Sequence, residues 1–308
     1  NMCDNSGHLP VLPNQVCDLL DPQQGDVIVD LTAGRGGHAE LLAKRAGENA
    51  TVILFDLDAE NLQFATSRLE KLGISVESHH ESFVTAASTL TRAGIQAHCV
   101  LADLGFSSNQ MDDPIRGFSF GSDGPLDMRL DSSKGTTAAD LVNSLSEKEL
   151  ADTIYFLGEE PYSRRIAQKI TLERQEKPIL HTARLAQLVR DAYGARAHSS
   201  RLHPATRTFM ALRIAVNAEL DALDALLLDV ETGGRKVDSG GWLHPTAKIA
   251  VISFHSLEDR RVKQSFVALE KSELAKRLTR KPIRATDEEK SFNPRSRPAK
   301  LRVVQLGS

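Results

Sequence analysis

The chain lacks the sequence features of several protein classes. No run approaches the 18 apolar residues that a membrane-spanning helix requires. Only three cysteines occur among 308 residues, and no CxxC pair is present, so neither a disulfide framework nor a cysteine zinc site is supported. The first ten residues contain no apolar signal core, and we therefore expect a cytoplasmic protein with reduced thiols.

An excess of charge of either sign is also missing. The chain has 38 basic and 41 acidic residues, and a net charge of −3 argues at first sight against a nucleic-acid partner. The charges are unevenly distributed, however. Residues 260–302 contain 14 Lys and Arg against 5 acids, and residues 184–213 contain 6 Arg against one Asp. RNA binding requires a local basic patch rather than a positive net charge. The net charge of −3 therefore does not exclude a polyanionic partner.

The first hundred residues alternate between apolar strand patterns and helical patterns. Strands are expected at 27–30, 51–56, 74–80 and 99–103, and helices at 38–47, 59–72 and 83–93. This alternation predicts a parallel sheet covered by helices on both faces. Three acids, Asp30, Asp56 and Asp103, end three of these strands and should lie on one rim, where such sheets bind their ligands.

The pattern changes after about residue 112. Residues 113–135 are rich in Gly, Asp, Ser and Pro, and residues 136–200 show helical patterns with no convincing strand. Farther along, we expect one long helix over 208–230, strands at 248–254 and 301–306, and a charged surface loop over 270–298. The prediction is an α/β domain formed by residues 1–115 and 208–308, interrupted by an all-helical insertion over 116–207.

The turn after the first expected strand is rich in glycine and reads DLTAGRGGH at 30–38. Gly34 and Gly36 let the backbone approach a ligand closely, and with Ala39 they loosely fit a dinucleotide fingerprint. The same turn suits S-adenosylmethionine. Asp56, about 20 residues beyond the glycines, can accept hydrogen bonds from the ribose hydroxyls of either cofactor. An incidental glycine-rich turn is the alternative to both.

Asp103 favours S-adenosylmethionine. Further carboxylates on the rim would repel the phosphates of a nicotinamide cofactor, whereas S-adenosylmethionine carries a sulfonium and an ammonium and no phosphate. His255 ends another expected strand, in the run FHSLEDR at 254–260, and should face the same rim. The alternative for each acid is a solvated strand end, and for His255 it is a structural histidine.

Seven segments, in order along nearly the whole chain, resemble the RsmH (MraW) family of bacterial methyltransferases. They are GRGGH at 34–38, DLGFSS at 103–108, RGFSF at 116–120, DGPLDMR at 123–129, HPATRTF at 203–209, FHSLEDR at 254–260 and NPRSR at 293–297. The resemblance implies a Rossmann-like sheet with a helical substrate-recognition domain inserted after the fourth strand. It also implies methyl transfer from S-adenosylmethionine to N4 of a cytidine in 16S ribosomal RNA.

The resemblance also implies which residues contact the cofactor. They are Gly36, Gly37, His38, Asp56, Phe83, Asp103 and Gln110, and the glycine-turn pattern adds Gly34. Two positions depart from the family pattern, since Leu31 stands where Gly or Ala is usual and Asn109 where Pro is common. Neither departure removes an implied contact. They leave open an organellar relative that acts on mitochondrial small-subunit rRNA.

The chemistry is assigned as a hypothesis. The exocyclic amine of cytosine is a weak nucleophile, so a site must orient it and accept hydrogen bonds from its protons. We expect Ser107, Ser108 and His255 to hold the base, with Asp103 and His255 as the catalytic residues. Further candidates for contacts with the rRNA are Ser256, Arg164, Arg165 and Arg207. For each arginine, a solvated helix face is the alternative.

Three classes of function remain to be separated. The methyltransferase leads, and its expected partners are small-subunit rRNA, free or in the assembled subunit, and a second copy of the chain. A nicotinamide oxidoreductase shares the glycine turn and Asp56 but does not explain FHSLEDR or HPATRTF. A non-catalytic RNA-binding assembly factor needs the basic segments but not the glycine turn. No metal is expected.

Overall fold

A computed structural model describes residues 9–307. The chain forms two compact units, of which one comprises the residues up to Gly105 and from Leu220 onward, and the other comprises Phe106–Glu219. We call them the α/β unit and the helical unit. None of the helices within residues 9–307 combines the length and hydrophobicity needed to cross a bilayer.

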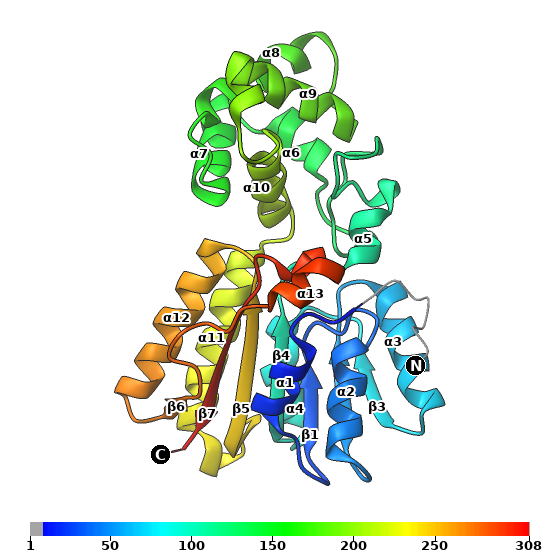
Figure 1. Ribbon diagram of the computed structural model, residues 1–308, viewed down its shortest axis with the longest axis vertical. Coiled ribbons are helices and arrows are strands. Elements are labelled where there is room, and N and C mark those ends of the chain that lie inside the picture. The colour runs from blue at the N-terminus through cyan, green and yellow to red at the C-terminus, as the bar shows by residue number, and fades with distance from the viewer. Residues whose placement is uncertain (1–8, 308) are drawn as a thin grey trace. The chain divides into compact units, whose positions relative to one another are not determined.

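The α/β unit is built on a seven-stranded sheet of order β3-β2-β1-β4-β5-β7-β6 (Figure 1). The strands are β1 (Val27–Asp30), β2 (Thr51–Phe55), β3 (Ser75–His79), β4 (Ala97–Asp103), β5 (Leu243–Ser253), β6 (Ala275–Arg277) and β7 (Lys300–Leu306). The first five are parallel, whereas β7 runs antiparallel to β5 and to β6. The predicted Rossmann-like α/β fold is confirmed. The parallel sheet predicted from the first hundred residues is confirmed for β1 to β4, and β7 is the reversed strand.

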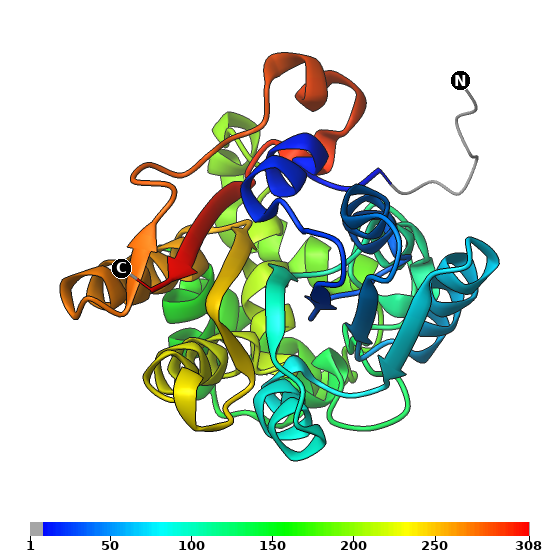
Figure 2. The same ribbon diagram turned by 90° about the horizontal axis from the view of Figure 1, so that it is seen from below.

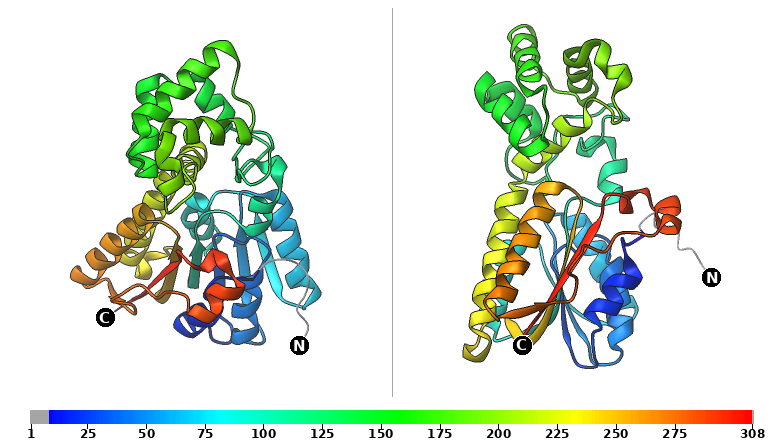
Figure 3. Two further views of the ribbon diagram at one scale, coloured as in Figure 1. Left: turned by 45° about the horizontal axis from the view of Figure 1, so that its top comes forward. Right: turned by 60° about the vertical axis from the view of Figure 1, so that its left-hand side comes forward.

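Helices cover both faces of this sheet (Figures 2 and 3). One face carries α1 (Pro13–Leu20), α2 (Gly37–Ala46) and α3 (Ala59–Lys71), and the other carries α4 (Ala86–Ala93), α11 (Glu219–Arg235) and α12 (Ser256–Lys271). Successive strand residues point to opposite faces, so Ile28 of β1 enters the first core and Val29 enters the second. Both faces of β1, β2 and β4 are buried, which explains why these strands are continuous apolar runs.

The order of the strands reverses at β1. It pairs with β2 on one side and with β4 on the other, and Asp30 lies beside both Leu54 and Leu101. Asp56 directly follows β2, and Asp103 is the last residue of β4. The prediction that the three acids share one rim is therefore confirmed. This reversal is the switch point at which open α/β sheets bind their ligands.

The helical unit has a core of its own. Its α-helices are α5 (Ser108–Asp112), α6 (Ala138–Ser144), α7 (Glu147–Gly158), α8 (Ser163–Glu176), α9 (Thr182–Tyr193) and α10 (Thr206–Val216). Ile154, Ile166 and Leu185 are among its fully buried residues. The Thr137 side chain caps α6 by accepting a hydrogen bond from the Asp140 N–H.

The long helix expected over 208–230 is instead two helices. α10 ends at Val216 and α11 begins at Glu219. Between them, the Asn217 side chain accepts from Leu130 N and donates to Met128 O, both at 2.8 Å, and Ala218 has a φ of 46°. The apolar pattern does not reveal the break because it arises from contacts about 87 residues back along the chain.

The prediction of a surface loop over 270–298 is also wrong. This stretch contains β6, the helix α13 (Asp287–Phe292) and a 3-10 turn at Pro294–Ser296. Glu289 is buried and accepts a 2.8 Å hydrogen bond from Leu12 N, 277 residues away. The charged sequence resembles a solvated loop, but the Glu289 carboxylate is hydrogen-bonded to the N-terminal part of the chain.

Candidate active site

Packing explains two of the glycines in the turn after β1. Gly36 has a φ of +82°, and a Cβ there would lie 3.2 Å from the Cα and Cβ of Ala65 in α3. A Cβ on Gly37 would meet the Pro10 ring at 3.4 Å. These glycines therefore allow α3 and the N-terminal segment to approach the turn closely.

Gly34 differs, because space beside it is open. It has a φ of +51°, and a Cβ there would find no heavy atom nearer than a backbone oxygen at 4.0 Å. Its N–H donates to Asp56 Oδ2 at 2.8 Å, and Asp56 Oδ1 accepts from Asp58 N at 2.8 Å. Burial raises the pKa of Asp56 to about 6 despite these two bonds. Each oxygen retains a second lone pair, so the carboxylate can brace the turn and still accept hydrogen bonds from ribose hydroxyls.

Asp30 is the most buried of the rim acids, at 1% exposure. Its Oδ1 accepts from Thr32 N at 3.1 Å, but its Oδ2 has no hydrogen-bond partner among the described residues. Burial, with the nearby charges of Asp103 and Asp56, raises the pKa of Asp30 to about 7. Since an orphaned buried oxygen is costly, this atom points to a ligand. The sequence predicts that Asp30 lies on the rim but indicates no role for it.

Asp103 makes the charged contacts of the rim. Its carboxylate lies 3.3–3.4 Å from the two terminal nitrogens of Arg295 and 3.9 Å from His38 Nδ1. Its backbone N–H donates to Thr32 Oγ1 at 2.7 Å, which ties β4 to the turn after β1. Arg295 lies in the NPRSR segment, whose sequence alone indicates no role for it.

His38 holds the N-terminal segment in place. Its Nε2 lies 2.7 Å from the carbonyl oxygen of Val11, so this nitrogen carries a proton and donates it. The ring is buried, and burial lowers its pKa below the usual value. Because Nε2 is engaged, a contact to a cofactor is left to Nδ1 or to the backbone. The predicted cofactor role of His38 stays a prediction.

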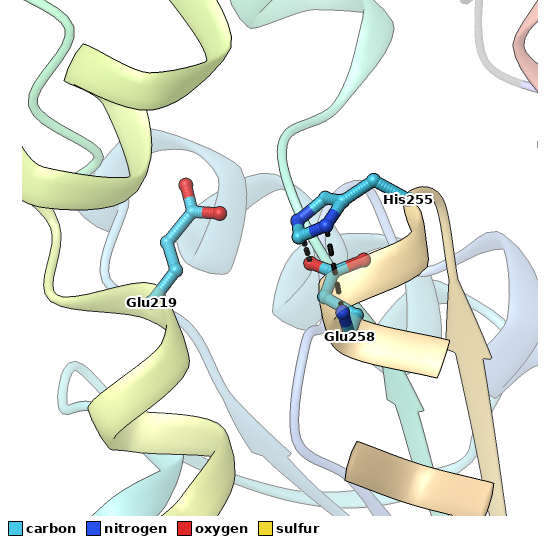
Figure 4. Close-up of side chains that lie close together, drawn as sticks. All are labelled: Glu219, His255 and Glu258. Atoms are coloured by element: carbon cyan, nitrogen blue, oxygen red, sulfur yellow. Dashed lines mark hydrogen bonds and ion pairs between the residues drawn. The ribbon is translucent and has the colours of Figure 1, made fainter. Parts of the chain in front are cut away.

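His255 caps α12, as Figure 4 shows. Its Nδ1 accepts from Glu258 N at 3.4 Å, and its Nε2 lies 3.2 Å from Glu258 Oε1. Glu258 Oε2 accepts from Phe254 N at 2.8 Å. The imidazole is thus fixed just beyond the carboxyl end of β5, and Ser256 begins the helix. The structure gives His255 a capping role, and its catalytic role remains a prediction.

Figure 4 also draws Glu219, whose carboxylate forms an ion pair with Arg213 at 2.9 and 3.0 Å within the helical unit.

The other predicted site residues are divided between the two units. In the α/β unit, Phe83 begins a 3-10 turn after β3 and packs partly buried against the core. In the helical unit, Gln110 is buried and its Oε1 accepts from Ser107 N at 2.9 Å, which caps α5. The remaining residues are Ser108 at the start of α5, Arg164 and Arg165 exposed on α8, and Arg207 on α10.

The helical unit contains a cavity of about 380 Å³ next to Arg207. Arg196, whose guanidinium lies 5.6 Å from the centre of the Tyr162 ring, lines it as well. Arg207 Nη1 donates to Glu159 O at 3.3 Å. Neither Arg196 nor Tyr162 was predicted as a site residue, although Arg196 lies in the basic segment 184–213.

The α/β unit combines features at its switch point that suit a cationic ligand. Its switch point gathers three acids around a glycine turn, with an orphaned carboxylate oxygen on Asp30 and open space at Gly34. A second orphaned buried oxygen, Ser253 Oγ, ends β5 next to β4. A sulfonium, an ammonium and ribose hydroxyls fit these acceptors, whereas a pyrophosphate would be repelled.

The strand order also separates this sheet from a nicotinamide-binding one. The common nicotinamide-binding sheet has the order 3-2-1-4-5-6, without the reversed strand β7 found here. The fold and site define a Rossmann-like methyltransferase.

Comparisons with known proteins agree with that class. The model of the MraW methylase family matches residues 5–306, and the chain belongs to this family. A relative from Syntrophotalea carbinolica is 44% identical, with 97% of each chain covered. One from a Cyanothece species is 45% identical over 97% of this chain and 94% of its own. One from Sorangium cellulosum is 46% identical over 97% and 90%. All three bear the name ribosomal RNA small subunit methyltransferase H.

Proposed function

We propose that this chain transfers a methyl group from S-adenosylmethionine to the N4 amine of a cytidine in the rRNA of the small ribosomal subunit. The observation that carries this proposal is the acid-lined switch point with its orphaned oxygen on Asp30, in a chain of the MraW methylase family. The names of the relatives supply the substrate class.

The α/β unit would hold the cofactor through its carboxylates. S-adenosylmethionine, when bound, supplies a methyl group activated by a sulfonium. Asp56 is placed to accept hydrogen bonds from ribose hydroxyls, and the open side of Gly34 leaves room beside it. Asp103 supplies negative charge at the switch point, and so does Asp30 once it has lost its proton. Burial of both carboxylates strengthens the attraction of their charged forms for a cation.

Binding of the base is assigned to polar groups at the ends of β4 and β5. The weak cytosine amine needs a fixed acceptor for its protons, and Asp103 and His255 are both held by contacts on the protein side. A base inside an RNA helix must first leave its stack. Arg207 and Arg196 of the helical unit offer cationic contacts for phosphates, and Tyr162 offers a ring for stacking.

The direct test uses the purified chain with tritiated S-adenosylmethionine and 16S rRNA or isolated small subunits. Label in N4-methylcytidine, located by mass mapping of rRNA fragments, is the expected result. Mitochondrial small-subunit rRNA serves as a parallel substrate, because it separates an organellar enzyme from a bacterial one. If the chain binds rRNA but calorimetry detects no S-adenosylmethionine binding, the assembly-factor alternative is favoured. A change in NADH absorbance would instead favour the oxidoreductase.

A further inference from the structure

The C-terminal segment reaches the switch point, although it lies 192 residues from Asp103 in sequence. Arg295, in the 3-10 turn Pro294–Ser296, contacts the Asp103 carboxylate with both terminal nitrogens at 3.3–3.4 Å. Its guanidinium also lies over the Phe254 ring, 4.7 Å from the ring centre. The side chains of Arg295 and Asp103 are 23% and 10% exposed, so water screens this pair only partly.

The segment that carries Arg295 is itself anchored. Asn293 Nδ2 donates to the carbonyl oxygens of Leu9 and Pro10 at 3.3 and 3.5 Å, and Ser296 Oγ donates to Asn293 O at 2.7 Å. Asn293 and Ser296 are both buried. Arg295 therefore projects from a turn fixed on either side, with a ring on one face of the guanidinium and a carboxylate at its end.

We propose that Arg295 is a positioning residue for cofactor binding, which fixes the Asp103 carboxylate at the switch point in the orientation that S-adenosylmethionine requires. This inference rests on the proposed function. The planar fork of a guanidinium matches a carboxylate at two points, which a point charge cannot do. Without Arg295, Asp103 keeps one ion-pair contact among the described residues, to His38 Nδ1 at 3.9 Å, and burial lowers the pKa of that ring below its usual value.

Positioning and simple charge effects predict opposite results. Arg295 brings a positive charge to a site proposed for a cationic ligand, so through charge alone its removal would tighten binding. If Arg295 acts by orienting Asp103, its removal weakens binding instead. The sign of the change therefore separates the two roles.

The experiment measures the dissociation constant of S-adenosylmethionine by calorimetry for the full chain and for three variants. We expect Arg295→Gln to weaken binding about 10-fold and Arg295→Lys about 3-fold, since lysine keeps the charge but loses the fork. The matched control is Arg297→Gln. Arg297 is exposed and lies two residues after Arg295, so this variant removes the same charge from a neighbouring surface position. The control should bind like the parent chain.

A double-mutant cycle guards against a general loss of structure. In an Asp103→Asn background, Arg295→Gln should change the dissociation constant less than 2-fold, because the carboxylate that it positions is gone. Unchanged or tighter binding by Arg295→Gln in the parent chain would overturn the inference, and so would an equal loss in both backgrounds. If the parent chain binds the cofactor but methylates no rRNA, the proposed function fails while this inference is judged on binding alone. If the parent chain does not bind the cofactor, both are overturned.

Discussion

Replacing Asp30 by asparagine should stabilise the cofactor-free protein at neutral and alkaline pH. In the folded chain burial raises the pKa of Asp30 from 3.8 to about 7, so between these values the folded state keeps a proton that the unfolded state loses. The parent chain therefore loses stability as the pH rises through this window, and the loss is complete above pH 7. Asparagine does not ionise and keeps an oxygen for the hydrogen bond from Thr32 N.

The magnitude follows from the size of the shift. A difference of about three pKa units corresponds to about 4 kcal/mol, at about 1.4 kcal/mol per unit. At pH 8 the Asp30→Asn variant should gain up to this amount in free energy of unfolding, and at pH 5 about 2 kcal/mol. The gain should thus shrink as the pH falls.

The assay is urea unfolding followed by tryptophan fluorescence at pH 5 and pH 8. Trp242 is the single tryptophan of the chain and is buried in the core of the α/β unit, so its signal reports the unit that contains Asp30. The exposed Asp238, changed to asparagine, is the matched control in the same unit. A gain equal at both pH values, or a variant less stable than the parent chain at pH 8, would refute the reasoning.

Three further results are expected. Binding of a cationic cofactor should lower the pKa of Asp30 and so release protons near pH 7. Calorimetry in buffers of different ionisation enthalpy measures this release, and none is expected for Asp30→Asn. Gly36→Ala should destabilise the α/β unit by about 1–3 kcal/mol in the same urea assay, because its φ of +82° and the contact with Ala65 both disfavour a side chain; unaltered stability would contradict the packing explanation. His255→Asn keeps a capping side chain, so turnover should fall while cofactor affinity and melting temperature stay nearly constant. Undiminished turnover would leave His255 with a structural role only.

The sequence predicted the parts of the site that depend on local patterns. β1 and the acids at the ends of the first strands follow from short apolar runs and the residues after them, because each strand is buried on both faces. The glycine turn was predictable as well, because its glycines follow one another closely in the sequence. Its glycines were interpreted as room for a ligand, whereas Gly36 and Gly37 also make room for Ala65 and Pro10.

Long-range contacts were not predictable in this way. The pairing of Arg295 with Asp103 joins residues 192 positions apart, and the bond from Leu12 N to Glu289 joins residues 277 apart. Neither pair has a spacing that a periodic pattern can show. The break at Asn217 has the same origin, because its side chain satisfies backbone groups of a distant loop.

The central claim is that the acids at the switch point bind S-adenosylmethionine for methylation of small-subunit rRNA. Its most direct test is mass mapping of 16S rRNA incubated with the purified chain and the cofactor, compared with the Asp56→Ala variant. We expect one N4-methylated cytidine with the parent chain and a loss of at least about 10-fold in its rate of formation with the variant, whose turn loses the bond from Gly34 N. An unmodified rRNA, or equal methylation by both proteins, would contradict it.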